Sequence, residues 1–296
     1  IAQTAQAIQS ILTPLMAGGL FVTIGMRGII LIDFITYFFA VFALLVVRIP
    51  QPEITAEKKT EKGQVKQDLV FGWNYLRARQ GLFGLLFYFA MVNFTLNFAG
   101  VLTGPLVLSA HPPSAYGLVQ TMLGAGLLSG GLLISAWGGP QTKRVPALIG
   151  CIAAASFGLL IVGVNQHLAF PAAGFFLMML FIPIASSLSQ AVFQTKVAPE
   201  VQGRVFAVRG LIARSMMPIA YILSGLLADH IFEPMMQVGG TLGGTLLGTL
   251  VGVGDGRGIG LMFVLAGLMG MGVSLLVYLN PRIRKLEVEI PDALRG

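Results

Sequence analysis

Eight long apolar stretches, separated by short polar gaps, run through this chain of 296 residues and predict eight membrane-crossing helices. A helix of about 20 apolar residues spans the roughly 30 Å of hydrocarbon in a bilayer. The runs are continuous and do not alternate in polarity from one residue to the next, which favours helices over a transmembrane barrel. The expected helices cover residues 8–25, 29–47, 82–107, 117–137, 147–164, 168–189, 208–228 and 259–279.

A polar linker and an amphipathic helix are expected between the second and third stretches. Residues 54–65 mix both charge signs with almost no apolar side chains, a composition typical of a solvated, mobile linker. The next segment reads DLVFGWNYLRARQG and combines apolar residues such as Trp73 with the cations Arg77 and Arg79. This pattern predicts an amphipathic helix that lies on the inner face of the membrane.

Two clusters of glycine interrupt the apolar pattern. The cluster in the fourth expected helix predicts close packing against another helix. Its members are Gly124, Gly126, Gly130 and Gly131. The second cluster has a glycine at every fourth position of residues 239–260, at Gly240, Gly244, Gly248 and Gly252. A ninth span there would be short and would place the basic tail opposite the other basic gaps. We therefore expect an outer loop, interfacial or re-entrant, with a flexible glycine-rich loop as the equal alternative.

Composition supports the membrane assignment. The chain is 55% apolar and only 10% charged, with a mean hydropathy of +0.83, which leaves too little polar surface for a water-soluble globule. We therefore expect an all-α integral membrane protein. The one cysteine, Cys151, has no partner for an intrachain disulfide and is interpreted as a small packing residue.

The cations fall almost entirely in alternate gaps and so predict a topology. Of the 19 Lys and Arg residues, only Arg27 and Arg257 lie in the other gaps. The remainder are Arg48, Lys58, Lys59, Lys62, Lys66, Arg77, Arg79, Lys143, Arg144, Lys196, Arg204, Arg209, Arg214, Arg282, Arg284, Lys285 and Arg295. Cytoplasmic loops retain such residues, so both ends of the chain are expected inside the cell membrane. The pI near 9.8 then reflects orientation, and no nucleic-acid partner is expected.

One acid lies well inside an apolar run. Asp33 stands in IILIDFITYFF, in the outer half of the second expected helix. A carboxylate inside a bilayer is costly and often functional, so Asp33 is a candidate for proton coupling. The alternative, which the residues favour somewhat more, is a structural acid that bonds to a neighbouring helix or reaches the outer interface.

Several uncharged polar residues are candidates for a substrate cavity. Asn93 and Asn97 lie four apart, on one face of the third expected helix, with Asn93 near mid-membrane. They bind a substrate or bond between helices, and the residues alone do not decide between these roles. Weaker candidates of the same kind are Gln120, Ser187 and Gln190, with Ser186 beside them.

No motif indicates catalysis. The chain has no nucleotide-binding loop, nucleophile elbow or zinc signature, so neither an enzyme nor a cofactor is expected. His111, His167 and His230 are expected in outer loops or at helix ends, too far apart in sequence to suggest a metal site. Arg214, a turn inside the seventh helix, could attract an anionic substrate or gate the inner mouth, although snorkelling to the headgroups is the commoner fate.

Four segments resemble a known family. They read PLMAGGLFVTIGMRGIILIDFITYFFAVFALLVVRIPQPE, DLVFGWNYLRARQGLFGLL, VAPEVQGRVFAVRGLIAR, and LADHIFEPMM with GRGIGLMFVLAGL. In these segments the chain resembles major facilitator superfamily transporters, specifically the drug-proton antiporter branch with macrolide and enterobactin exporters. Members have twelve helices in two halves, and the eight helices here resemble helices 5 to 12. The first four helices are therefore expected to be missing from this chain, and they would be its partner.

The resemblance implies a domain organisation. Residues 1–47 would hold the last two helices of the N-terminal half, and 48–80 the cytoplasmic linker with its amphipathic helix. Residues 81–280 would form the C-terminal six-helix half, and 281–296 a cytoplasmic tail. The inner-loop signature of the family is similar to WGGPQTKRV, although the family Asp is absent here, which puts an Asp-based latch in question. The conformational candidates are Gly138, Gly139, Lys143, Arg144, Arg204 and Arg214.

The resemblance also implies a function. It indicates proton-coupled efflux of an amphipathic small molecule by alternating access, with the lipid bilayer, the substrate and protons as partners. In that arrangement Asn93 approaches the cavity and Asp33 lies on a helix of the other half. Two alternatives remain open: a lysophospholipid or lipid flippase of the same fold, and a membrane scaffold subunit that does not transport.

Overall fold

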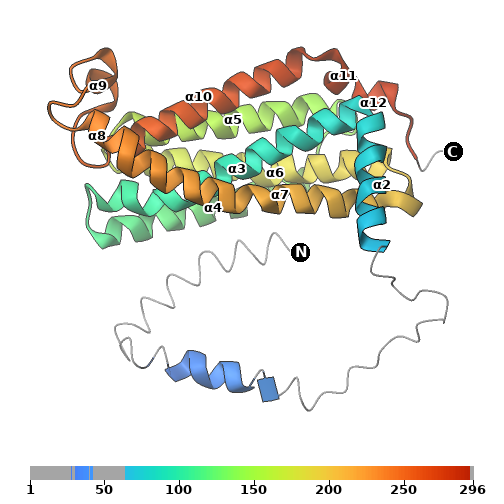
Figure 1. Cartoon of the computed structure of the whole chain (residues 1–296), viewed down its shortest axis with the longest axis horizontal. Coiled ribbons are helices and arrows are strands. Elements are labelled where there is room, and N and C mark those ends of the chain that lie inside the picture. The colour runs from blue at the N-terminus through green and yellow to red at the C-terminus, as the bar shows by residue number, and fades with distance from the viewer. Residues whose placement is uncertain (1–27, 29–30, 40, 43–63, 294–296) are drawn as a thin grey trace.

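The computed structural model describes residues 28, 31–39, 41–42 and 64–293 (Figure 1). The described residues before 63 are helical and fall in the region of the second expected helix. The first expected helix, 8–25, lies outside the described residues, as does most of the linker.

Six long helices lie side by side along one axis and form a bundle (Figure 1). They are α3 Gln80–Leu108, α4 Pro113–Trp137, α5 Arg144–Val164, α6 Ala169–Lys196, α7 Pro199–Leu227 and α10 Arg257–Leu279. α7 continues through a π-helical turn, η1 Ala228–Phe232, and through α8 Glu233–Met236, so that its span has 38 residues. Each of the six spans is long and apolar enough to cross a bilayer, and the described residues contain no strand. The prediction of an all-α membrane fold is confirmed.

The sixth and seventh helices are longer than predicted. α6 ends at Lys196 instead of residue 189, and α7 begins at Pro199, well before the expected start of the seventh span at residue 208. The apolar run ends near 189, but Gln, Lys and Arg are good helix formers, so the helix continues past it. Pro199 suits the first helical position because its missing N–H would have had no partner there. The polar residues between the two apolar spans are therefore mostly helical.

Glycines bring α4, α5 and α6 into close contact. A Cβ on Gly158 of α5 would lie 2.6 Å from the carbonyl oxygen of Gly174 on α6. A Cβ on Gly126 of α4 would lie 3.0 Å from the Cβ of Met179 on α6. Side chains at these positions would push the helices apart, as in other small-residue contacts within membranes. The predicted close packing of the fourth helix is confirmed at Gly126 and does not extend to Gly131, which faces open space.

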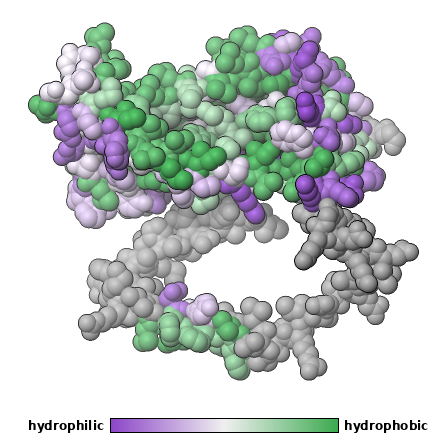
Figure 2. Space-filling view, in the orientation of Figure 1, coloured by the Kyte–Doolittle hydropathy of each residue, from purple (hydrophilic) through white to green (hydrophobic). Residues whose placement is uncertain are grey.

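One end of the bundle collects the basic segments, and we call it the basic end. α2 Gln64–Ala78 lies across this end, roughly perpendicular to the long helices (Figure 1). The α4–α5 loop, the junction of α6 with α7, and the short helices α11 Pro281–Arg284 and α12 Leu286–Glu289 also meet there. Figure 2 shows apolar surface along the middle of the bundle and hydrophilic surface gathered at the α2 end and at the opposite tip. Gaps that alternate in the sequence thus converge in space.

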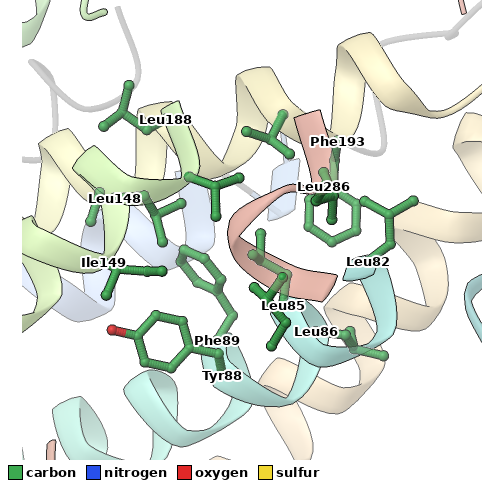
Figure 3. Packing of buried hydrophobic residues seen from close by; sticks show 14 of the residues in the cluster. Leu82, Leu85, Leu86, Tyr88, Phe89, Leu148, Ile149, Leu188, Phe193 and Leu286 are labelled. Carbon is green, nitrogen blue, oxygen red and sulfur yellow. The ribbon is translucent and has the colours of Figure 1, made fainter. Parts of the chain in front are cut away.

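The basic end has its own apolar core (Figure 3). Leu82 and Leu85 of α3 are fully buried there, together with Phe193 of α6. Leu286 of α12 packs in the same cluster with no exposed surface, and Leu76 anchors one face of α2. The amphipathic helix expected after the linker is therefore present as α2. The tail, expected only as a cytoplasmic extension, contributes a side chain to the core.

The glycine-rich segment at the opposite end is a folded loop. Its only helix is α9 Leu246–Val251, so the four regularly spaced glycines do not line one continuous face. Arg257, at the start of α10, is 1% exposed and donates a hydrogen bond of 2.6 Å to the carbonyl of Gly163. Glu233 accepts hydrogen bonds from the backbone N–H groups of Gly256 and Ile259 and so caps α10. The segment is therefore a loop with one short helix and not a ninth membrane span, as expected, while its outer position stays a prediction.

Candidate functional site

A cavity of about 320 Å³ opens between α3, α6 and α7. Its lining residues are Leu86, Phe89, Ala90, Asn93, Ser186, Gln190, Phe206, Arg209, Gly210 and Ala213. Most of this surface is aliphatic or aromatic. A small number of polar groups in a mostly apolar concavity is typical of small-molecule sites.

Helical periodicity explains why these side chains share one cavity. The four lining residues of α3 follow the spacing i, i+3, i+4 and i+7, and so do the four of α7. The two lining residues of α6 are four apart. Each set therefore occupies a single helix face, and the three faces converge. Each of the three helices contributes one wall of the cavity.

Arg209 is the charged residue of this cavity. Its guanidinium donates hydrogen bonds to Ser189 Oγ at 2.7 Å and to Gln190 Oε1 at 3.2 Å. The ring centroids of Phe193 and Phe89 lie 4.6 Å and 5.3 Å from its central carbon, within the range of cation–π attraction. These four contacts fix the position of the cation without neutralising it.

The cavity lies well inside the bundle. Asn93 stands thirteen residues after the start of α3 at Gln80, or about 20 Å along a helix that is about 44 Å long. Arg209 stands ten residues into α7, or about 15 Å from its first residue, Pro199. The cavity therefore extends from the half of the bundle nearer the basic end to its middle.

The structure brings two of the predicted cavity residues together. Asn93 and Gln190 both line the cavity, whereas Asn97, Gln120 and Ser187 do not. The amide nitrogens of Asn93 and Asn97 donate to carbonyls of α3 itself, those of Phe89 and Asn93, at 2.8 Å and 2.7 Å. Neither amide bonds to another described helix. Ser186, named beside Ser187 in the sequence, is the serine that reaches the cavity.

The other charged candidates lie away from this cavity. Asp33 is exposed in the helical residues 31–39 and does not line it. Arg204 pairs with Asp68 of α2 at 2.8 Å and lies 4.9 Å from the ring centroid of Phe71, so it joins α2 to α7. Arg214 is exposed on α7.

Two of the loop candidates, Lys143 and Arg144, line a second cavity of about 660 Å³ at the basic end, where most lining residues are polar. Gly138 and Gly139 turn the chain after α4 with φ of 76° and 74°, values that favour glycine. Lys143 precedes α5 with φ 59°, and Arg144 donates to the carbonyl of Pro140 at 3.3 Å. The N-terminus of α5 is capped from the tail, where Glu287 Oε2 accepts a hydrogen bond of 3.1 Å from the backbone N–H of Val145.

Sequence reasoning did not include Arg209 among the candidate site residues. The expected span of the seventh helix began at 208, so Arg209 was grouped with the loop cations. Because α7 starts at Pro199, Arg209 lies nearly three turns into the helix, on the same face as Phe206 and Ala213. That helical position was the signal that could have found it.

The cavity between α3, α6 and α7 can accommodate a small molecule. Among the described residues, there is no group of three or more His, Cys, Asp or Glu side chains that could hold a metal ion. His111 Nε2 lies 2.8 Å from the carbonyl oxygen of Gln166, in a loop contact. The cavity walls combine aromatic surface with hydrogen-bonding groups and one cation, which suits an amphipathic molecule with a polar head.

Comparison with known proteins gives a consistent family match. A sequence profile of the Major Facilitator Superfamily matches residues 1–221. Macrolide efflux protein A of Streptococcus pyogenes is 30% identical over 239 residues, 77% of this chain and 57% of the relative. Macrolide efflux protein A of Enterococcus faecalis is 30% identical over 227 residues, 73% of this chain and 68% of the relative. The chain thus spans little more than half the length of the Streptococcus pyogenes protein. No solved structure matches it.

Proposed function

The chain belongs to the major facilitator superfamily, and from this premise we propose that it works in a proton-coupled transporter that exports amphipathic small molecules from the cell. The cavity between α3, α6 and α7 carries the proposal. It has the volume, the aromatic wall and the few polar groups that a bound amphipathic molecule requires, and it reaches the middle of the membrane-spanning bundle.

The relatives named for macrolide efflux support the outward direction and suggest the first compound to test. The full-length protein is expressed in a bacterial strain that lacks its own drug exporters, and the accumulation of labelled erythromycin and of a dansylated amphipath is measured. We expect lower accumulation than in the empty strain, and we expect a protonophore to abolish the difference.

Each other result of this assay separates the proposal from its alternatives. Lipid-dependent transport that does not respond to the proton gradient would support a lipid flippase of the same fold. Unchanged accumulation of every compound, by a protein that is present in the membrane, would support a scaffold subunit. Either result would overturn proton-coupled efflux.

Asp33 is the residue we propose for proton coupling. It is the one acid inside the apolar run of the second expected helix, and an ionisable side chain at such a position is costly and often functional. Asp33→Asn keeps the size of the side chain and removes its titration. We expect the variant to bind the amphipath and lose gradient-driven export. Export at the wild-type rate would remove Asp33 from the mechanism.

We also propose that the basic end faces the cytoplasm. The convergence of α2, the α4–α5 loop and the tail supports this, because cytoplasmic segments retain Lys and Arg. Single cysteines at Thr142 and at Thr241, in a Cys151→Ser background, mark the two ends of the bundle. A thiol reagent that does not cross membranes is expected to label Thr241→Cys in intact cells and Thr142→Cys only in opened cells. The reverse pattern would contradict this orientation.

A further inference from the structure

We propose that the cavity around Arg209 selects amphipathic molecules with an anionic head, such as a carboxylate, which places the anion on Arg209 and the apolar body against α3 and α7. This inference rests on the proposed function, because it names the substrate class of the same cavity. The hydrogen bonds of Arg209 support the anionic head group, and the apolar walls around it support the apolar body.

The walls of the cavity carry a positive charge. Among the described residues, the cavity walls include Arg209 and no Asp or Glu. The two groups that accept hydrogen bonds from its guanidinium, Ser189 Oγ and Gln190 Oε1, are both neutral. Arg209 is half-buried, and a partly buried cation gains more from an anion than a fully exposed one does, because water screens their attraction less.

The guanidinium of Arg209 has N–H groups available to donate hydrogen bonds to a ligand. A guanidinium has five N–H groups in a planar fork, and two of them are used by Ser189 and Gln190. Three N–H groups are left for a ligand among the described contacts. A carboxylate accepts two parallel hydrogen bonds from such a fork, an amide presents one neutral oxygen, and an ammonium presents none.

Two buried aromatic rings restrict the conformation of the Arg209 side chain. Phe89 and Phe193 are 8% and 0% exposed, and both rings lie against the guanidinium. The side chain of Arg209 is therefore held in position before a ligand arrives. An anion then binds without ordering a long side chain, which is a cost that weakens many surface contacts.

The cavity also offers apolar walls to the hydrocarbon body of the ligand. Leu86 and Phe89 come from α3, and Phe206 and Ala213 come from α7. These side chains give an apolar wall on either side of the cation. A molecule with an anionic head and a hydrocarbon body matches both parts of the cavity.

The test compares three probes with one body. They are 11-(dansylamino)undecanoic acid, its primary amide, and the analogue with a trimethylammonium group in place of the carboxylate. Binding to the full-length protein in nanodiscs is followed by dansyl fluorescence. We expect the carboxylate to bind about tenfold more tightly than the amide, and the trimethylammonium probe to bind most weakly.

Variants then assign the preference to Arg209. Arg209→Gln is expected to bind carboxylate and amide equally, and Arg209→Lys to retain part of the preference as a point charge without the fork. Arg77→Gln removes the same charge from an exposed position on α2 and is expected to behave as wild type. Size-exclusion profiles show whether each variant is folded. The wild-type probe series decides the proposal even if Arg209→Gln does not fold.

The outcomes separate this inference from the proposed function. Equal binding of the three probes, or a preference that survives in folded Arg209→Gln, would overturn the anionic substrate class. If gradient-driven export of the amide or of erythromycin were still observed, the proposed function would stand. Tight carboxylate binding that depends on Arg209, with no export of any compound, would overturn the proposed function and leave the site intact.

Discussion

Two cations of the bundle, Lys196 and Arg209, are held in opposite ways. Lys196, the last residue of α6, is 7% exposed, and its ammonium donates to the carbonyls of Glu287 and Ile290 at 2.7 Å and 2.5 Å. It also pairs with Asp292 at 2.9 Å. Arg209 lies against the rings of Phe89 and Phe193 and donates to neutral oxygens. The charge of Lys196 holds the tail, whereas that of Arg209 is positioned with no ion pair to an acid among the described residues.

This difference suggests different roles: Lys196 stabilises the fold, and Arg209 recognises a ligand. A buried charge is expensive, and it contributes to stability only when its partners satisfy it well. Lys196 meets that condition, because its ammonium contacts three oxygen atoms of the tail and so holds the tail against the end of α6. Arg209 does not, and such an incomplete set of partners is common where a protein keeps a group for a ligand.

The largest effect is expected from Lys196→Met. The substitution keeps most of the side-chain length and removes the ammonium that donates to the two carbonyls and pairs with Asp292. We expect a loss of about 3 kcal/mol in the free energy of unfolding. Reversible unfolding in mixed dodecyl sulfate micelles, followed by tryptophan fluorescence, measures it.

Lys66→Met is the matched control, because Lys66 is exposed on α2. It should leave the free energy of unfolding unchanged and should not alter the rate at which trypsin cuts the tail near Arg284. Lys196→Met should speed that cleavage. An equal effect of the two variants would mean that Lys196 does not lock the tail.

A smaller effect is expected from Glu287→Ala. Its carboxylate accepts the N–H of Val145 and lies at the N-terminus of α5, where a negative charge is favourable. Loss of a capping group typically costs about 1 kcal/mol. The same unfolding assay checks this value, with Glu289→Ala, an exposed acid of α12, as the control. Equal stability of both variants would exclude a capping role.

Arg209→Gln sharpens the comparison with Lys196. It removes two cation–π contacts but also the cost of a charge in an apolar cavity, so the two effects nearly cancel. We expect a change below about 1 kcal/mol in the unfolding assay, together with the loss of carboxylate preference described above. A loss as large as that of Lys196→Met would show that Arg209 is structural.

The smallest effect is expected from the ion pair of Arg204 with Asp68. Both side chains are well exposed, at 44% and 41%, so water screens their attraction. A double-mutant cycle with alanine at each position should give a coupling of about 0.5 kcal/mol that disappears at high salt. A coupling of several kcal/mol would mean that α2 is held to α7 mainly by charge.

Sequence reasoning predicted what local pattern controls. The long apolar runs located all six bundle helices, and the amphipathic pattern around Trp73 located α2. Asn93 and Gln190 were found because polar residues stand out in apolar surroundings. The alternation of basic gaps indicated which segments share one end of the bundle, because each span reverses the direction of the chain.

The sequence could not predict contacts between distant segments. The partners of Lys196 lie more than 90 positions away, in a tail whose residues look like ordinary solvated charges. Leu286 stands between Lys285 and Glu287 in the sequence, and only the fold shows that it is fully buried while the nearby Val288 is exposed. Arg209 was grouped with loop cations, since its environment is built by Phe89 of α3 and Phe193 of α6.

The central claim is that Arg209 carries a charge that the protein leaves for its ligand. The most direct test is an experimental structure of the full-length protein with 11-(dansylamino)undecanoic acid bound. We expect the probe carboxylate within hydrogen-bonding distance of the Arg209 guanidinium, with the dansylated body against Leu86 and Phe206. A structure in which a carboxylate of the protein itself, Asp33 included, pairs with Arg209 and the probe binds elsewhere would contradict the claim.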